Sequence, residues 1–589
     1  MSDPAPGLAA GTRRLLTPAL LVALVAGVLV PTLRAPLFMD DYAHLWAIES
    51  PALGLTRLGA NTYGVTTLDD PEVRSLLPWW TSADFRFDYY RPMSTLLLAL
   101  EWRLWGRSSA GYHLTSLVAH LVAVLLLYRL IGSLGIGAGG ALAGSALLAL
   151  HPGNLIAVYW ISNRSDVVVL ALAITALLAY RAAGRAARRG WALHVAAVAA
   201  LGVAILTKEI ACLLPAVFLL HDLLEPGARP QAPAPTLASV LRRGLRATPY
   251  LALSASYVLW YRASGHGIRS GYAPSSLELP PLAELSFLAR SAVLATLELV
   301  TGLPPSMRRH EHLFDGANAA LAAGFVAAAA IATALALRGE RRRATRLFAL
   351  GWIGLFTAPT LGFLPSPRYL YVASAGWALL VASVVDGWLA SIPSRPLRAL
   401  GIAATAAYVA VVPALADRWL MGRLEIELGR AFPGLVESYT RGFGPPRDGE
   451  RIVLVNTPSP ATASLIGAAF RFLNPGIDVR AAVLTSFPTP PALVADDSHT
   501  LRVSAPPGHH FFEQPVDWIY LTSRRATLGQ TFRGADLVAT ITAMDGDQPT
   551  EVTFRFERPL ADPAWVPICF DGPERTLRRC PFPVPPTLP

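Results

Sequence analysis

The chain turns polar at the stretch FMDDYAH, residues 38–44, which follows its first long apolar run at about residues 15–33. A chain that crosses a bilayer in that run would leave it here. Adjacent carboxylates such as Asp40 and Asp41 are unusual at a membrane surface, because each loses hydration and each repels the other. The pair therefore belongs either to a solvated acidic loop or to a reactive site.

The composition indicates a membrane protein. Of the 589 residues, 53% are hydrophobic and 15% are charged, whereas a soluble protein carries about 25% charged residues. Several apolar runs reach the length of about 20 residues that a spanning helix needs. The net charge of +10 comes from Arg clusters between these runs. These clusters predict the orientation of the chain in the bilayer, and we expect no nucleic-acid partner. We expect a polytopic α-helical membrane protein whose first span is retained and not cleaved.

Basic clusters set the expected orientation, because Lys and Arg stay on the cytoplasmic side. Arg13 and Arg14 precede the first span, so residues 33–110 should form the first external loop. A helix at about 285–303 should not cross, because crossing would place the basic cluster at 341–346 outside. We expect about eleven spans, a cytoplasmic N-terminus and an extracytoplasmic C-terminus. The expected spans are at about residues 15–33, 111–131, 138–151, 162–181, 191–206, 210–224, 247–262, 316–338, 345–364, 368–390 and 398–420.

The sequence changes character at about residue 424, which predicts two domains, a multi-span domain over 1–423 and an extracytoplasmic β-rich domain over 424–589. Short runs with alternating hydrophobic residues and intervening turn residues are typical of strands. Cys569 and Cys580 could pair in an oxidising compartment, while His509 and His510 lack companion metal ligands. The predicted strands are at residues 452–455, 479–484, 501–503, 518–521, 537–541 and 552–556.

Charged and polar residues gather at the outer ends of the predicted spans. Such residues are costly at membrane depth and usually mark a functional cavity. Several of both signs on one leaflet suit a cleft that binds an anion and removes a proton. The residues are Asp40, Asp41, Asp88, Arg91, His151, Arg164, Asp166, Lys208, Glu209, Arg368 and Tyr369.

Each of these residues also has a simpler interpretation. Lys208 with Glu209 could be an exposed ion pair of little energetic value, although a lysine between two spans suits a phosphate clamp. Arg368 could be an anchor in an aromatic belt, and Arg164 with Asp166 could only cap the fourth span.

Three histidines belong to the same region of the predicted bundle. His113 and His120 are seven residues apart and share one face of the second span. His120 should be a buried packing residue, whereas His113 and His151 are nearer the outer surface and are better candidates for substrate binding.

The order of motifs resembles the TMTC-type branch of the GT-C glycosyltransferases, with the protein O-mannosyltransferases as more distant relatives. The likeness covers about residues 15–390, and the chain departs from that branch by having no tetratricopeptide tail. The motifs in order are the acidic pair, YRP at 90–92, YH at 112–113 with His120, HP at 151–152, YWISNRSD at 159–166, TKE at 207–209, HDL at 221–223, RYLY at 368–371 and SAG at 374–376.

The resemblance implies a transferase that uses a polyprenyl-phosphate sugar and acts on the outer face, with the acidic motif beside the reacting sugar carbon. Asp40 or Asp41 would take the proton of an acceptor hydroxyl. Lys208, Arg368, Arg91 and Arg164 would bind the donor phosphate. Asp88, His113, His151, Asp166, Glu209 and Tyr369 would contact substrate. The acceptor would be a protein or a glycan, and the Ala, Arg and Pro content suggests a bacterial inner membrane with a periplasmic site.

Two questions stay open at this point. A divalent metal could sit on the acidic pair, but hard cations need more oxygen ligands than the motif supplies, so a metal-independent reaction is favoured. A transporter or flippase of lipid-linked sugars would also carry intramembrane charges, although it should show internal repeats. A non-enzymatic envelope assembly protein is the third alternative.

Overall fold

The structure is a computed structural model that forms two compact units. We call Met1–Ala35, Leu104–His266 and Leu279–Gly422 the helical unit, and Pro36–Arg103, Gly267–Glu278 and Arg423–Pro589 the loop–sheet unit. The residues that the structure describes are 7–50, 61–65, 68, 70–186, 190–224, 238, 244–266, 281–302, 312–337, 342–363, 366–392, 394, 396–397, 399–401, 403, 405, 431–457, 460–513, 517, 520–521, 526–571 and 576–584.

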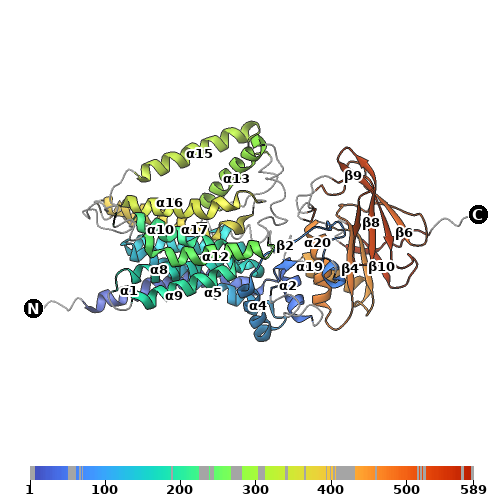
Figure 1. The fold of residues 1–589 in the computed structure, drawn as a ribbon, viewed down its shortest axis with the longest axis horizontal. Helices are drawn as coiled ribbons and strands as arrows, with labels where there is room; N and C mark the ends of the chain where they lie inside the picture. Colours follow the sequence, from blue (N-terminus) through green and yellow to red (C-terminus); the bar gives the residue numbers. More distant parts are fainter. Residues whose placement is uncertain are drawn as a thin grey trace, which may run out of the picture. The chain divides into compact units, whose positions relative to one another are not determined.

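The helical unit contains a helix at every predicted span from 15–33 to 368–390 (Figure 1). The predicted span at 398–420 lies mostly outside the described residues. The α-helices are α1 Gly7–Leu29, α5 Ser109–Ser133, α6 Ala138–Leu150, α7 Pro152–Tyr159, α8 Ser165–Ala183, α9 Gly190–Thr207, α10 Leu214–Leu224, α12 Thr248–Ala263, α13 Pro281–Thr301, α15 Gly316–Leu337, α16 Arg343–Thr357 and α17 Tyr371–Ser391. Short 3₁₀ turns include η2 Ile161–Arg164, η3 Glu209–Leu213 and η6 Pro367–Leu370.

Five described helices are long and apolar enough to cross a membrane, and a bent pair makes a sixth candidate. The five are Ser109–Ser133, Ile161–Ala183, Gly190–Thr207, Gly316–Ala334 and Arg368–Ser391. A polytopic helical membrane protein is therefore confirmed. We predicted eleven spans, but fewer than eleven of the described helices are long enough to cross. The helices α10, α12 and α16, for example, have 11, 16 and 15 residues.

The bent pair is α6 with α7, which meet at 55° around His151. Pro152 is the first residue of α7. A proline has no N–H to continue the preceding helix, but its fixed φ suits the start of a new one. Small residues let α6 approach α17 closely, since a Cβ on Gly144 would lie 2.5 Å from the Ala378 carbonyl oxygen.

The loop–sheet unit contains two sheets. The first has the strand order β11-β10-β3-β4, and its strands are β3 Arg451–Asn456, β4 Arg480–Thr485, β10 Trp565–Asp571 and β11 Thr576–Arg579. Strands β10, β3 and β4 are parallel, and α20 (Pro460–Leu473) connects β3 to β4. The second sheet is antiparallel with the order β5-β6-β9-β8-β7, and its strands are β5 Ala492–Ala495, β6 Thr500–Ser504, β7 Thr531–Arg533, β8 Leu537–Asp545 and β9 Gln548–Phe556.

A C-terminal domain with β-sheets is confirmed, with two corrections of detail. The predicted strand at 518–521 is wrong at Tyr520 and Leu521, which are buried outside any strand, and Trp518 and Ile519 lie outside the described residues. Two helices were not predicted as such, α19 (Ala431–Phe443) and α20. Helix α20 packs on β4, so its apolar run is explained by a crossover connection between parallel strands.

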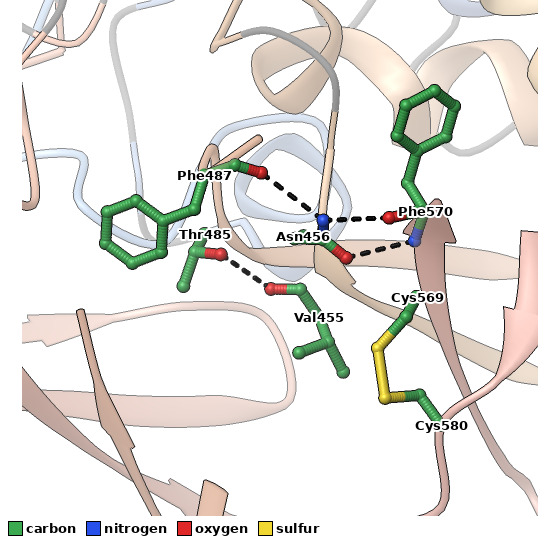
Figure 2. The surroundings of a disulfide bond; sticks show 7 residues. All are labelled: Val455, Asn456, Thr485, Phe487, Cys569, Phe570 and Cys580. Atoms are coloured by element: carbon green, nitrogen blue, oxygen red, sulfur yellow. Dashed lines mark hydrogen bonds between the residues drawn. A yellow bond between two sulfur atoms is a disulfide. The ribbon is translucent and has the colours of Figure 1, made fainter. Parts of the chain in front are cut away.

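Side-chain contacts tie the first sheet together at the end of β3 (Figure 2). Asn456 Nδ2 donates to the carbonyl oxygens of Phe487 at 3.3 Å and Phe570 at 3.0 Å, and its Oδ1 accepts from the Phe570 N–H. Cys569 and Cys580 form the disulfide that the sequence allowed, between β10 and the residue after β11.

The first loop is part of the loop–sheet unit and supplies much of its core. Its elements are α2 Asp41–Glu49, β1 Gly64–Val65, α3 Pro71–Arg74, β2 Phe87–Asp88 and α4 Pro92–Trp105. Our sequence-based division grouped residues 33–110 with the spans, whereas packing groups Pro36–Arg103 with Arg423–Pro589. Figure 1 shows α2 beside α20, with which it packs.

Trp79 is the centre of this packing. Its indole Nε1 donates to the Leu484 carbonyl oxygen at 3.0 Å. Its ring centroid lies 5.0 Å from that of Phe554 on β9 and 5.7 Å from that of Phe532 on β7. Trp79 is 4% exposed, so a loop residue fills the hydrophobic core of the sheet domain.

Charged contacts reinforce the same association. Glu72 on α3 forms ion pairs with Arg471 on α20 and with Arg480 on β4, the latter at 3.2 Å. Arg480 also lies 3.2 Å from Asp536. Partly buried networks of this kind fix geometry more than isolated surface pairs do.

Candidate functional site

The acidic pair lies at a strained turn of the loop–sheet unit. Met39 has φ 46°, in the left-handed region that a non-glycine residue seldom adopts. Asp41 is 1% exposed, and its Oδ2 accepts from the Phe38 N–H at 3.0 Å. The Asp40 side chain is 30% exposed. The two carboxylates therefore differ, since Asp41 holds the turn and Asp40 is the one that a second molecule can reach.

A series of contacts between rings and charged groups leads from Asp40 to Arg91. His44, one helical turn along α2, has its Nε2 3.6 Å from Asp40 Oδ2, and its ring lies 4.3 Å from that of Tyr63. The Arg91 guanidinium lies 4.3 Å from the centre of the Tyr89 ring and 5.5 Å from that of Tyr63. We call Asp40, His44, Tyr63, Tyr89 and Arg91 the loop cluster.

Asn61 joins the segments that carry this cluster. Its Nδ2 donates to the Tyr89 carbonyl oxygen at 2.6 Å, and its Oδ1 accepts from the Arg91 N–H at 3.1 Å. The backbone of Asp88 pairs with that of Gly64 between β2 and β1. The Asp88 side chain lies outside what the structure describes, so its predicted contact with substrate stays a prediction.

In the helical unit, Lys208 is part of a buried ion pair. Its Nζ lies 2.6 Å from Asp166 Oδ2, and the two side chains are 8% and 2% exposed. The pair joins the end of α9 to the first turn of α8. The alternative of an exposed pair between Lys208 and Glu209 is therefore wrong for Lys208, and Glu209 is half-buried at the start of η3.

Arg164 is 2% exposed and reaches back toward α5. Its Nη1 donates to the Tyr112 carbonyl oxygen at 3.1 Å and to Ser116 Oγ at 3.3 Å. No side chain caps the start of α8, so the capping alternative is wrong. Arg164 instead connects η2 to α5.

Arg368 lies within an aromatic group of the helical unit. Its guanidinium is 4.6 Å from the centre of the Trp160 ring, and its Nη2 donates to the Tyr369 hydroxyl at 3.0 Å. The residue is 7% exposed. A cation held over aromatic faces keeps its charge in an environment from which water is excluded. Such an arrangement is suited to binding an anion.

Of the three histidines of the bundle, His120 has the packing role that its sequence position suggested, while substrate contact by His113 and His151 stays a prediction. His120 Nε2 donates to the Ala149 carbonyl oxygen at 3.1 Å, so its Nδ1 accepts from the Tyr371 hydroxyl at 2.6 Å. These bonds join α5, α6 and α17 and confirm a packing role. His113 is buried with its ring 5.5 Å from that of Tyr159, and His151 Nε2 lies 3.2 Å from the Leu299 carbonyl oxygen.

The described residues contain no group of three or more His, Cys, Asp or Glu side chains placed to hold a metal ion. Metal dependence at the acidic pair stays a question for experiment.

Several residues of these clusters were missed by sequence reasoning. His44 carried a usable signal, because it lies four residues after Asp40 and a helix brings such residues together. Asn61 and Tyr63 carried no such signal in the sequence. Tertiary contacts place them beside Tyr89 and Arg91, about thirty positions later.

Replacing Asp166 with Asn should lower the free energy of unfolding by about 3–5 kcal/mol, because the buried Lys208 ammonium loses its carboxylate. Thermal unfolding of the purified protein in detergent measures the effect. The double variant Asp166→Leu with Lys208→Met should recover most of the loss, since an apolar pair replaces the buried charges.

The matched control is Glu437→Gln, which breaks an ion pair with Arg441 whose side chains are 71% and 75% exposed. Its effect should be about 0–1 kcal/mol. Equal losses for Asp166→Asn and Glu437→Gln would contradict a structural role for the buried pair.

Residues 91–241 match the family model described as dolichyl-phosphate-mannose-protein mannosyltransferase. The protein O-mannosyl-transferase Tmtc1 of Drosophila melanogaster is 30% identical over 140 residues, which are 24% of this chain and 16% of that protein. A protein O-mannosyl-transferase of Caenorhabditis elegans is 30% identical over 92 residues, 15% of this chain and 13% of that protein. The resemblance to GT-C glycosyltransferases is confirmed. The chain spans only these small fractions of both relatives, so their activities pass to it only as proposals.

Two solved structures show looser similarity. One is the archaeal oligosaccharyltransferase AglB from Archaeoglobus fulgidus in complex with an inhibitory peptide and a dolichol-phosphate. It is 14% identical to this chain with a TM-score of 0.42. The match covers 78% of this chain and 64% of the AglB chain. Another is ArnT from Cupriavidus metallidurans bound to undecaprenyl phosphate. It is 16% identical to this chain with a TM-score of 0.44. The match covers 77% of this chain and 84% of the ArnT chain. Similarity at this level assigns no role to any residue here.

Proposed function

We propose that this protein is a membrane glycosyltransferase that moves a sugar from a polyprenyl-phosphate donor to an acceptor hydroxyl, with Asp40 as the general base. The loop cluster is the observation that carries the proposal. It contains an accessible carboxylate and a histidine 3.6 Å away, and a strained residue outside the cluster, Met39, directly precedes the carboxylate. Strain of this kind persists where the surrounding structure holds a reactive group in position.

In the proposed reaction the acceptor O–H bond breaks and its proton passes to the Asp40 carboxylate. The acceptor oxygen bonds to the anomeric carbon of the sugar. The bond between that carbon and the phosphate oxygen breaks, and polyprenyl phosphate leaves with the electron pair. His44 orients the Asp40 carboxylate, and Asp41 holds the turn.

The departing phosphate needs positive charge, which Arg91 of the loop cluster can supply within the same unit. Arg91 is 9% exposed, and its guanidinium is held over the Tyr89 ring, 4.3 Å from the ring centre. Lys208 in the helical unit is neutralised by Asp166, so we assign it a role in holding α8 and α9 together. We place the reaction on the extracytoplasmic side of a bacterial inner membrane, with a protein or glycan as the acceptor.

The test is a turnover assay in proteoliposomes with a panel of radiolabelled polyprenyl-phosphate hexoses and membrane extract as the source of acceptor. We expect transfer of label from one donor and release of polyprenyl phosphate. Arg91→Gln should raise the donor KM by about tenfold or more, because a charged hydrogen bond to phosphate is lost.

Release of no lipid phosphate from any donor would contradict the proposal. Movement of a labelled lipid between leaflets without cleavage would favour a flippase instead.

A further inference from the structure

The helix α4, which precedes α5 in the chain, has one face that is both apolar and exposed. Leucines recur on this face at every fourth position, and they are 60%, 53% and 64% exposed. Residues four apart lie one above another on a helix, so the three side chains form a continuous row. We call Leu96, Leu100 and Leu104 the leucine row.

The opposite face of α4 is held by protein contacts. Ser94, Thr95, Leu98 and Glu101 are all buried. Thr95 Oγ1 also accepts a hydrogen bond from the Thr62 N–H at 3.0 Å. These contacts fix the rotation of α4 about its axis and keep the leucine row outward. A contiguous exposed apolar surface of this kind marks a site that binds a membrane or another molecule.

The C-terminal end of α4 is fixed to the first turn of α5 by contacts within the helical unit. Three residues separate the two helices. A Cβ on Gly111 would lie 2.3 Å from Trp105 Cγ, so the indole packs directly on the α5 backbone. The Tyr112 hydroxyl donates to the Gly106 carbonyl oxygen at 2.7 Å.

Helix α5 relates this end of α4 to the bilayer. It is one of the helices that are long and apolar enough to cross a membrane. Its 25 residues exceed the number of about 20 that crosses the hydrocarbon core, so its first turn lies at the membrane surface. The end of α4 that packs on this turn therefore lies at the membrane surface too.

We propose that the leucine row of α4 lies in the lipid at the surface of the bilayer, on the side where α5 begins. The residues beside the row agree with this location. Arg103 is exposed next to the row, and Trp105 at its end is 36% exposed. An arginine can keep its charge among the headgroups while its stem lies on apolar surface, and tryptophan is enriched at membrane–water interfaces.

A row with the same spacing continues along α5. Its members are 41%, 51% and 44% exposed on a helix of crossing length, so they would contact lipid. Apolar surface exposed on both helices is what an amphipathic helix at the membrane surface, followed by a span, should show. The residues of the α5 row are Leu114, Val118 and Val122.

The loop cluster is joined to the start of α4. The helix begins at Pro92, directly after Arg91, and the bond between Thr62 and Thr95 attaches it to the segment that carries Tyr63. A leucine row in lipid would thus keep these residues near the headgroups. The inference goes beyond the proposed function and does not depend on it, because it concerns the contact of α4 with lipid.

A second copy of the chain or another protein could also cover an apolar row. Lipid is favoured, because the row is fixed to a helix of membrane-crossing length and is followed by lipid-facing residues of that helix. The experiment must therefore distinguish lipid, water and protein as the surroundings of the row.

The experiment attaches a nitroxide label to Leu96→Cys or Leu100→Cys in the full chain in nanodiscs. Cys212 is first replaced with Ser, since Cys569 and Cys580 form a disulfide. Collisions with oxygen, which concentrates in hydrocarbon, and with a water-soluble nickel chelate report the surroundings of each label. Both labels should collide more with oxygen than with nickel, at a depth of about 5–10 Å into the boundary between headgroups and acyl chains.

Two matched controls calibrate the measurement. Val118→Cys on α5 is a lipid control at a position that is 51% exposed, and its label should collide mainly with oxygen. Val494→Cys on β5 is a water control at a position that is 46% exposed, and its label should collide mainly with nickel. All four substitutions are at exposed positions, so thermal unfolding of the labelled proteins should be unchanged.

Each result decides the proposal. Labels at Leu96 and Leu100 that behave like the label at Val118 support a leucine row in lipid. Labels that behave like the one at Val494 would show that the row faces water, and the proposal would be wrong. Labels that neither oxygen nor nickel reaches would show that protein covers the row, which would also overturn it.

Discussion

Asp40→Asn is expected to abolish glycosyl transfer while the protein folds and inserts normally. Loss of a general base typically lowers kcat by about 10²–10⁴. Asn has the shape of Asp but cannot accept a proton, and the Asp40 side chain is 30% exposed, so little packing is disturbed. The measurement is single-turnover transfer from the preferred donor, with thermal unfolding of the same sample.

The neighbouring residue is the sharpest comparison. Asp41→Asn should change the turn that the bond from the Phe38 N–H to Asp41 holds, so a lower unfolding temperature should accompany any loss of activity. Asp84→Asn, at an exposed position of the same loop, should change neither. Normal turnover by Asp40→Asn would remove the proposed base from the mechanism.

Trp79→Ala is expected to destabilise the loop–sheet unit by about 3–5 kcal/mol, the usual cost of truncating a buried aromatic side chain. The indole packs against Phe554, Phe532 and Phe512 and donates a hydrogen bond to Leu484. All of these partners come from the C-terminal part of the chain, more than 400 residues away. Chemical unfolding followed by tryptophan fluorescence and circular dichroism measures the loss.

Activity should fall together with stability in this variant, because the loop cluster is built on the same unit. The control is Trp191→Ala, since Trp191 is 73% exposed and its removal should cost little. An unchanged unfolding midpoint for Trp79→Ala would contradict the association of loop and sheets in one core.

This association changes how the acidic loop should be regarded. A loop between two spans would ordinarily be mobile, yet α2 packs on α20 and Glu72 binds Arg471 and Arg480. The sheet domain thereby serves as a rigid support for Asp40 and its neighbours, a condition that precise proton transfer requires.

Local sequence patterns were enough for much of this protein. The long apolar runs predicted its helices, since about 20 apolar residues can satisfy their backbone within a bilayer only as a helix. Alternating runs predicted β3, β4, β6, β8 and β9, and the spacing of motifs indicated the glycosyltransferase resemblance. The strand at 518–521 was wrong because burial of Tyr520 and Leu521 comes from packing against other segments and not from a sheet.

What the sequence by itself determined is therefore the kind of elements, their order and the chemical groups that they carry. Only the tertiary structure decided that Asp166 neutralises Lys208, that Asp41 and Asp40 have different surroundings, and that Trp79 belongs to the sheet core. The reason is physical. Secondary structure follows from periodicity within a few turns of chain, whereas the burial and charge of a side chain depend on partners tens or hundreds of residues away, whose approach no local pattern records.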